Sequence, residues 1–543
     1  MSSHAVVPRP GSSQGIADPS PWDDPVGPGR ATGARGLWQT LPDTTGAVWL
    51  LIVGFTLLRL VLAATLPLLP QEAYYWTWSL HPALSYFDHP PLASAGIWLT
   101  TALFGSTVFG IKCAAVLWSL SWNLLWARLI LDMFASQRLA FWSVLALNLT
   151  LMYEVYGVGP TPDGPLIFGW VGTIWSIWRL RASGHGRWWY AAGAFAGIAL
   201  LGKYSAVLLL PIVLLFLMVS ADCRHWLRKP QPYVALLLAL AIFSPVIVWN
   251  AEHQWASFAF QGSQRVGQMA AFKPRYFFNL LGTQLLLVTP FLFVISMAAL
   301  WRGARHWGSA DDRTRLLLIS AALPLLLFTA VSLRSHVKLN WLAPAWWSLI
   351  ILAMQQGLQS GPRARRMAAG LASSALVVLV AFAMAALPKL PLARDLNSWI
   401  GWKDTAERVD TLSRSIQAEG RQTFVFSPNY KISSLLRFYL PGQPRTYAQD
   451  IYGARALQFD HFPRTGDLAG ATGLLVVSDQ AQSRLDLKRL APWFDSVVLA
   501  DVFETLAGGR VVRRVEIYRC TNYTGHPRFD PAAPARPDDE VDE

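Results

Sequence analysis

Residues 71–92 read QEAYYWTWSLHPALSYFDHPPL, and this stretch carries two carboxylates, Glu72 and Asp88, between apolar segments long enough to span a bilayer. A third carboxylate, Asp163, lies in the sequence TPDGP at residues 161–165, again beside long apolar sequence. A carboxylate in or beside a membrane span is costly, and such residues usually have a function. The three residues are therefore the first candidates for the catalytic site of an integral membrane enzyme.

The composition places the chain in the membrane class. Of its 543 residues, 53% are hydrophobic and only 15% are charged, which is too little polar sequence to cover a soluble globule of this size. The formal net charge of +13 does not indicate a nucleic acid, because Lys and Arg are scattered between apolar spans. The expected counter-charge is an anionic lipid bilayer or a lipid phosphate. The three cysteines lie far apart, so neither a disulfide framework nor a zinc site is indicated.

The apolar sequence predicts a polytopic α-helical membrane domain over residues 47–387. Residues 1–46, rich in Pro, Gly and Ser, are expected to form a disordered cytoplasmic leader. With roughly 20 residues per span, we expect about eleven transmembrane helices. They are predicted at 47–68, 110–131, 139–158, 164–178, 189–201, 206–220, 232–250, 277–300, 316–333, 341–355 and 368–387.

Basic residues between the spans predict the orientation. Loops such as 179–187, 224–229 and 302–315 are rich in Lys and Arg and alternate with poorer loops, so their side is expected to be cytoplasmic. All three carboxylates then lie on the opposite side, which in a bacterial inner membrane is the periplasm. The segment after residue 388 lies on that side as well.

Six Lys and Arg residues are exceptions to this distribution of basic residues, since they lie on the non-cytoplasmic side, where Lys and Arg should be scarce. A phosphate or pyrophosphate on a membrane lipid would explain them, because Arg binds it through two hydrogen bonds and Lys as a point charge. Snorkelling to lipid headgroups explains Lys273 and Arg275 equally well. For Lys203, held between two apolar runs, we favour a functional role. The six are Lys203, Arg265, Lys273, Arg275, Arg334 and Lys338.

After residue 388 the composition becomes that of a water-soluble domain. We predict a periplasmic α/β domain over residues 388–529, with a helix at 403–418 and strands at 423–426, 474–477 and 511–518. An acidic, Pro-rich tail, residues 530–543, is expected to be disordered. The sequence shows no Walker motif or GxGxxG turn, so a nucleotide cofactor has no support.

Several of these segments occur together in one known family. QEAYYW at 71–76, YFDHPP at 86–91, TPDGP at 161–165 and GKYS at 202–205 follow in the order seen in polytopic glycosyltransferases. VWNAEHQW at 248–255 and the segment 331–344 agree with it. The chain resembles a bacterial member of the protein-mannosyltransferase and aminoarabinose-transferase superfamily, which has the GT-C architecture. The resemblance covers about residues 47–355 and does not include the C-terminal domain.

The resemblance implies transfer of one sugar from a polyprenyl-phosphate donor to a periplasmic glycolipid, such as lipopolysaccharide, or to a protein, with inversion at the anomeric carbon. The attacking hydroxyl needs a carboxylate to take its proton, and the departing phosphate needs positive charge. No cofactor is expected; the carboxylates could hold Mg or Mn, but no compact ligand motif is present and the resemblance favours metal-independent transfer. The expected substrate-binding residues are Tyr74, Tyr75, His89, Lys203, Tyr204, Asn250, His253, Arg265, Arg334, Lys338 and Asn340.

Gln71 departs from the family pattern. That pattern usually opens the first large loop with two acidic residues, and Gln71 stands in the first position, where it cannot act as a base. Glu72 is therefore the first candidate for the base and Asp88 the second, followed by Asp163. Each also has a structural interpretation: a capping carboxylate for Glu72, a loop-locking hydrogen bond for Asp88 and a helix N-cap for Asp163.

Two other classes of protein remain open at this stage. A transporter or lipid flippase also places charges inside a helical bundle, although here the charges gather on one face and the sequence shows no related halves. A non-catalytic assembly subunit would be favoured if Gln71 signalled lost activity.

Overall fold

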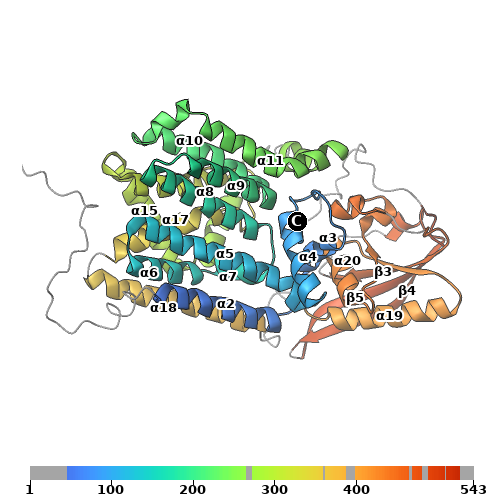
Figure 1. The fold of residues 1–543 in the computed structure, drawn as a ribbon. Coiled ribbons are helices and arrows are strands. Elements are labelled where there is room, and N and C mark those ends of the chain that lie inside the picture. The colour runs from blue at the N-terminus through green and yellow to red at the C-terminus, as the bar shows by residue number, and fades with distance from the viewer. Residues whose placement is uncertain are drawn as a thin grey trace, which may run out of the picture.

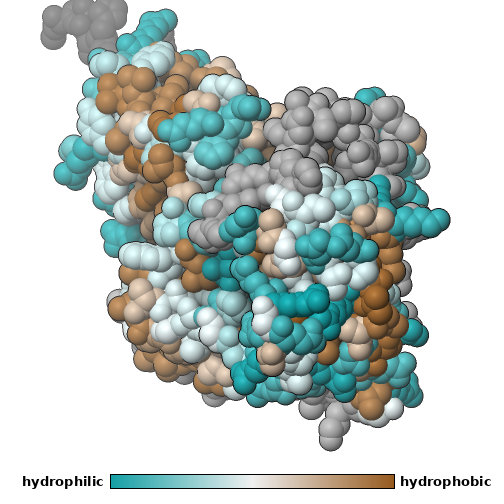
Figure 2. Space-filling view, turned by 90° about the vertical axis from the view of Figure 1, so that its right-hand side faces the viewer, coloured by the Kyte–Doolittle hydropathy of each residue, from teal (hydrophilic) through white to brown (hydrophobic). Residues whose placement is uncertain are grey.

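The structure, a computed structural model, describes residues 46–264, 272–358, 361–386, 398–463, 467–479, 487–507 and 509–525. It consists of a helical bundle with the C-terminal domain at one end, and α3 and α4 lie between the two (Figure 1). Seen from the side of the C-terminal domain, the surface is largely hydrophilic and hydrophobic atoms gather toward the margins (Figure 2). This contrast fits a membrane part that carries a water-facing domain.

The bundle is made of long apolar helices and several shorter ones. In chain order they are α2 (Ala47–Thr65), α5 (Val108–Phe134), α6 (Gln137–Asn148), α7 (Leu151–Val158), α8 (Asp163–Ser183), α9 (Arg187–Gly202), α10 (Leu209–Val219), α11 (Gln231–Glu252), α14 (Arg275–Val288), α15 (Pro290–Arg305), α16 (Asp312–Ser332), α17 (Ala343–Gly357) and α18 (Gly361–Ala386). The helices α5, α8 and α17 are buried along much of their length, which places them at the centre of the bundle.

The expected count of eleven transmembrane helices is not confirmed. Within the described ranges, five helices are long and apolar enough to cross a membrane, or seven if two bent pairs each count as one span. The pair α6–α7 bends by 73° and the pair α14–α15 by 110°. Others, such as α9 with 16 residues and α17 with 15, are helical where expected but short of a full span.

Two short helices form the junction between bundle and C-terminal domain. α3 (Pro70–Ser79) starts at Pro70, where the missing N–H of proline costs no hydrogen bond, and all its residues from Glu72 onward are buried. α4 (Leu92–Phe104) follows the Pro90–Pro91 pair and was not among the predicted helices. Between them, residues 80–91 form the loop that contains Asp88.

The C-terminal domain is a five-stranded mixed sheet with helices packed on it. The strand order is β2-β1-β3-β5-β4, in which β1 pairs parallel with both β2 and β3, and β5 pairs antiparallel with β3 and β4. The elements are α19 (Trp402–Ala418), β1 (Thr423–Phe426), α20 (Tyr430–Tyr439), β2 (Thr446–Tyr447), β3 (Thr472–Ser478), β4 (Ser496–Ala507) and β5 (Arg510–Thr521).

This domain agrees in class with the expected α/β domain, and α19, β1, β3 and β5 lie where the sequence indicates. α20, β2 and the edge strand β4 were missed. The helix α20 packs on α3, so the domain core continues into the junction rather than ending at the linker. The limits of the domain, residues 388 and 529, lie outside the described residues.

Candidate active site

Glu72 lies in the first turn of α3 and is almost completely buried. Its Oε2 accepts a hydrogen bond from the Leu69 backbone N–H at 2.9 Å, so the capping role is present. Both carboxylate oxygens also lie 2.7 Å from Nζ of Lys112 on α5. Gly159 packs beside the same carboxylate, since a Cβ there would come within 3.1 Å of Oε1. The ion pair therefore joins α3, α5 and the segment that leads to Asp163.

Asp88 lies in the 80–91 loop and is 7% exposed. Its Oδ2 accepts a hydrogen bond from the Tyr74 hydroxyl at 2.6 Å, and its backbone carbonyl accepts one from Gln261 Nε2 at 2.7 Å. Burial, with the nearby Asp88 charge as a second cause, raises the pKa of Tyr74 well above its usual value. Tyr74 thus stays a neutral hydroxyl donor to the carboxylate.

Asp163 is the first residue of α8, and Pro162 occupies the N-cap position. The Asp163 carboxylate instead contacts two residues from distant segments: Lys203 Nζ at 3.0 Å and Asn340 Nδ2 at 2.5 Å. Asp163 is completely buried and Lys203 is 6% exposed. The structure therefore brings together Asp163, Lys203 and Asn340, which the sequence motifs named separately.

Glycine makes the approach of Lys203 to Asp163 possible. Lys203 follows directly on the end of α9 in an extended conformation. A Cβ on Gly202 would lie 2.7 Å from the backbone nitrogen of Leu166, so only glycine lets the end of α9 touch the first turn of α8. The GKYS motif thus serves packing as well as charge.

Tyr204 links the Asp163 cluster to the Asp88 loop. Its hydroxyl lies beside Ser85, Ser257 and Asn250 and within electrostatic range of Asp88. Asn250 Oδ1 accepts the Ser257 N–H at 3.1 Å, and the Ser257 hydroxyl donates to the Tyr86 carbonyl at 3.1 Å. The end of α11 is therefore joined to the 80–91 loop.

The other expected site residues are less tightly grouped. The His253 ring stacks on Trp249 with centroids 4.0 Å apart, and the Tyr75 ring lies 6.3 Å from that of His89. Arg334 is exposed and Lys338 is half-buried in the turn before Asn340. Lys273 and Arg275 are exposed beside the Tyr276 ring at the start of α14. Arg265 lies outside the described residues.

Comparisons with known proteins find a family model that matches part of the chain and relatives that share its fold. A family model described as dolichyl-phosphate-mannose-protein mannosyltransferase matches residues 88–249, which contain Asp88, Asp163 and Lys203. The lipid A galacturonosyltransferase RgtD of Rhizobium johnstonii is 23% identical over 309 residues, or 56% of this chain and 64% of RgtD. The chain thus spans less than two thirds of that relative's length.

Two crystal structures of ArnT from Cupriavidus metallidurans share the fold. The apo state gives a TM-score of 0.61 at 15% identity, and covers 88% of this chain and 98% of ArnT. The structure bound to undecaprenyl phosphate gives 0.58 at 14% identity with the same coverage. The chain thus resembles the protein-mannosyltransferase and aminoarabinose-transferase superfamily over part of its sequence and shares the GT-C fold with ArnT. It is a multi-pass membrane protein, because five to seven helices in the described ranges are long and apolar enough to cross a membrane.

The structure also shows charged residues that the sequence reasoning missed. In this GT-C bundle, Arg59 on α2 donates to Glu154 on α7 and to Asn148 Oδ1 at the end of α6, each at 2.5 Å. Asn148 in turn donates to Asn123 Oδ1 on α5 at 2.7 Å. A signal was present, because ionisable residues inside apolar spans are functional or structural candidates by default.

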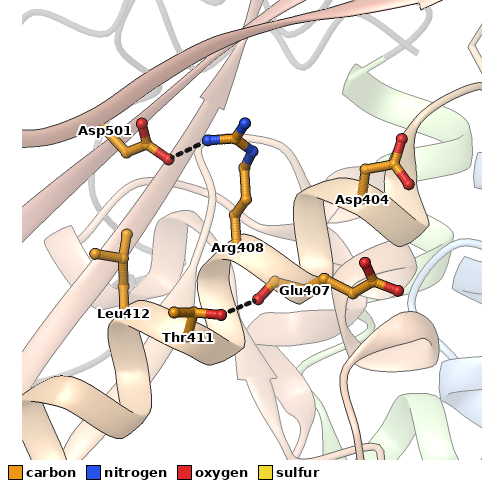
Figure 3. A pocket seen from close by; sticks show the side chains of 6 residues that line it. All are labelled: Asp404, Glu407, Arg408, Thr411, Leu412 and Asp501. Atoms are coloured by element: carbon orange, nitrogen blue, oxygen red, sulfur yellow. Dashed lines mark hydrogen bonds and ion pairs between the residues drawn. The ribbon is translucent and has the colours of Figure 1, made fainter.

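No metal site is found in the described parts of the chain, where no group of three or more His, Cys, Asp or Glu side chains is suitably placed. A shallow pocket of about 360 Å³ lies on the outside of the C-terminal domain, between α19 and β4 (Figure 3). There Arg408 pairs with Asp501 at 3.0 Å, and Asp404 and Glu407 lie along the same helix (Figure 3). None of the expected site residues lines it.

Proposed function

We propose that this protein is a membrane glycosyltransferase that moves one sugar from a polyprenyl-phosphate donor to a glycolipid acceptor, with inversion. The observation that carries the proposal is the contact of Asp163 with Lys203 and Asn340, near the Asp88 loop through Tyr204, in a chain that partly matches a mannosyltransferase family model. Asp163, Lys203 and Asn340 come from segments far apart in the sequence.

The chemistry follows from the residue types. The acceptor oxygen forms a bond to the anomeric carbon as its proton passes to a carboxylate, and the bond between that carbon and the phosphate oxygen breaks with its electron pair on the phosphate. A phosphate monoester is a competent leaving group, so this step needs no nucleotide. A cation beside the phosphate stabilises the charge that develops there.

We assign the base to Asp88 ahead of Glu72. Both oxygens of Glu72 lie against the Lys112 ammonium, and protonating that carboxylate would leave the buried ammonium without its counter-charge. Asp88 accepts a hydrogen bond from the neutral Tyr74 hydroxyl. Protonation of Asp88 therefore removes no counter-charge from a cation at that contact. Asp163, paired with Lys203, resembles Glu72 in this respect.

For the donor phosphate we propose Lys203 first and Arg334 second. Lys203 is buried beside Asp163, and its ammonium is a cation with three hydrogen-bond donors, the chemistry that a phosphate needs. Arg334 is exposed in the turn before Asn340, where its side chain can reach a phosphate at the bilayer surface. Undecaprenyl phosphate in one ArnT structure supports a lipid phosphate as the ligand class.

The acceptor class rests on the curated relative. RgtD is a lipid A galacturonosyltransferase, which favours a lipid A-type glycolipid over a protein acceptor and makes a uronic acid the first sugar to test. A hexose or pentose would give the same reaction with a different pocket.

The orientation is part of the proposal, because the donor phosphate and acceptor must meet at the periplasmic surface. Alkaline phosphatase fused after Asp395 should be active, and the same enzyme fused after Arg302 should be inactive. The reverse pattern would place the site on the cytoplasmic side and overturn the assignment.

The function itself is tested with the full chain in nanodiscs, supplied with undecaprenyl-phosphate sugars and lipid A. Mass spectrometry should show lipid A heavier by one sugar residue. A transporter would instead move lipid or sugar between leaflets without changing its mass. Absence of both activities would favour a non-catalytic subunit.

A further inference from the structure

A turn of the C-terminal domain reaches into the junction beside Asp88. This turn, the 3₁₀ helix Leu457–His461, carries Gln458, whose side chain is 3% exposed. From its contacts we infer that Gln458 is a positioning residue for Asp88, so that the soluble domain forms part of the reaction site. The inference rests on the proposed function in that it takes Asp88 as the base.

Gln458 contacts the Asp88 segment at two points. Its Oε1 accepts the Phe87 backbone N–H at 2.7 Å, directly before Asp88 in the chain. Its own backbone N–H donates to the Tyr74 hydroxyl oxygen at 3.0 Å, and that hydroxyl donates to Asp88 Oδ2 at 2.6 Å. Gln458, Tyr74 and the Phe87–Asp88 pair thus form a closed ring of hydrogen bonds.

The ring orients a proton. A phenol has one hydrogen to donate, and the Gln458 N–H occupies the oxygen from another side, so the Tyr74 O–H points to the carboxylate. The Phe87 contact fixes the backbone from which Asp88 projects. Both contacts are buried, where a hydrogen bond is stronger and its loss costs more than at the surface.

The backbone of the turn fixes the position of Gln458. Leu457 has φ of +52°, a left-handed conformation that is strained for a leucine and persists only where the surroundings impose it. Asp460 Oδ2 accepts the Ala456 N–H at 3.0 Å and closes the turn. Burial raises the pKa of Asp460 well above its usual value, with Asp88 among the charges that contribute.

Aromatic rings hold the turn against the junction. The Tyr74 ring is stacked on that of Phe459 with centroids 6.3 Å apart, and the Phe87 ring is stacked 5.3 Å from that of His461. These contacts place the turn residues that follow Gln458 against the junction, so we expect a change at Gln458 alone to leave the domain docked.

The test uses Gln458→Met in the full chain, which keeps the length of the side chain but removes the acceptor for the Phe87 N–H. We expect kcat to fall about tenfold, as for the loss of one buried hydrogen bond, with the donor KM unchanged. In an Asp88→Asn background the same change should cost nothing further, because Gln458 acts through Asp88. Wild-type kcat in Gln458→Met, or a full tenfold loss on top of Asp88→Asn, would overturn the inference.

A matched control separates positioning from domain stability. Ser433→Ala removes a buried hydrogen bond, Oγ to the Tyr447 carbonyl at 2.6 Å, inside the same domain. It should keep wild-type kcat, and an equal loss there would attribute the Gln458 effect to folding.

Hydrogen exchange measures the contact without any turnover. The Phe87 amide should exchange roughly tenfold faster in Gln458→Met, and an unchanged rate would reject the positioning contact. If the wild-type protein transfers no sugar while this amide responds, the proposed function fails and the contact stands.

Discussion

The inside of the bundle and its junction with the C-terminal domain use buried polar groups in different ways. In the bundle, Arg59 and Glu154 form an ion pair that also engages Asn148. At the junction, Asp88 is held by the neutral hydroxyl of Tyr74, which Gln458 orients. A charge already neutralised by a buried partner is suited to holding helices together, whereas protonation of Asp88 removes no counter-charge from a cation at its contact with Tyr74.

The largest effect should come from breaking the bundle pair. Arg59→Met leaves the Glu154 carboxylate buried without its cation, which should cost about 3–5 kcal/mol of stability. The double variant Arg59→Met with Glu154→Gln should be more stable than the single one, since both charges are gone. Thermal unfolding in detergent measures both. A single variant as stable as wild type would show that the pair does not hold α2 to α7.

The junction should show the reverse behaviour. Asp88→Asn keeps an acceptor for Tyr74 and should fold and insert normally, but kcat should fall about 100-fold or more because the base is missing. Donor affinity should be retained. Glu72→Gln is the comparison: we expect lower stability and a smaller loss of kcat per folded molecule. If Glu72→Gln loses kcat while Asp88→Asn turns over normally, the base is Glu72.

The segments that carry the candidate carboxylates could be predicted from the sequence, because each carboxylate is recognised by its immediate neighbours in the chain. Residues 71–76, 86–91 and 161–165 carry carboxylates in Pro-rich and aromatic contexts, and the structure brings these segments near one another: Tyr74 contacts Asp88, and Gly159 packs beside Glu72. The strands β1 and β3 were predicted because short apolar runs between turn residues have few other interpretations.

Pairings across long separations could not be predicted in this way. Lys112 pairs with Glu72 forty positions away, and Gln458 meets Phe87 across 371 positions. No local pattern states which helix will face which, since that depends on packing of the whole bundle. The count of eleven spans is not confirmed, because bends after Asn148 and Val288 divide two apolar runs and other helices, such as α9 and α17, are too short for a full span.

Lys203 combines both uses of a buried polar group, since it forms an ion pair with Asp163 in the bundle and is also the proposed ligand of the donor phosphate. Lys203→Ala should weaken donor use by about ten- to a hundredfold, as for the loss of a charge-assisted contact of roughly 1.5–3 kcal/mol. Arg334→Ala should have a smaller effect, because that side chain is exposed. Lys403→Ala, which removes an exposed charge on α19, is the control. Wild-type donor affinity in Lys203→Ala would make the Lys203–Asp163 pair structural.

The smallest expected effect concerns His81. In its neutral form this side chain links the 80–91 loop to α20. Its Nε2 accepts from Arg437 Nη1 on α20 at 3.1 Å. Burial, followed by the charges of Arg437 and Arg445, lowers the pKa of His81 to about 4, below the unfolded value of about 6.5. Above pH 6.5 neither state binds the proton, so the stabilising contribution is complete. Between pH 6.5 and 4 the unfolded chain takes up a proton that the folded protein excludes, and the stability of the folded state falls.

The variant His81→Gln tests this, because glutamine keeps a hydrogen-bond acceptor and does not titrate. Between pH 7 and pH 5 its unfolding temperature should therefore drop by about 2 °C less than that of wild type. The carboxylates titrate equally in the wild-type protein and in His81→Gln, so they do not contribute to the difference in unfolding temperature. Parallel curves for the two proteins would show that His81 is free to take up a proton in the folded state and that the junction is not held by neutral groups there.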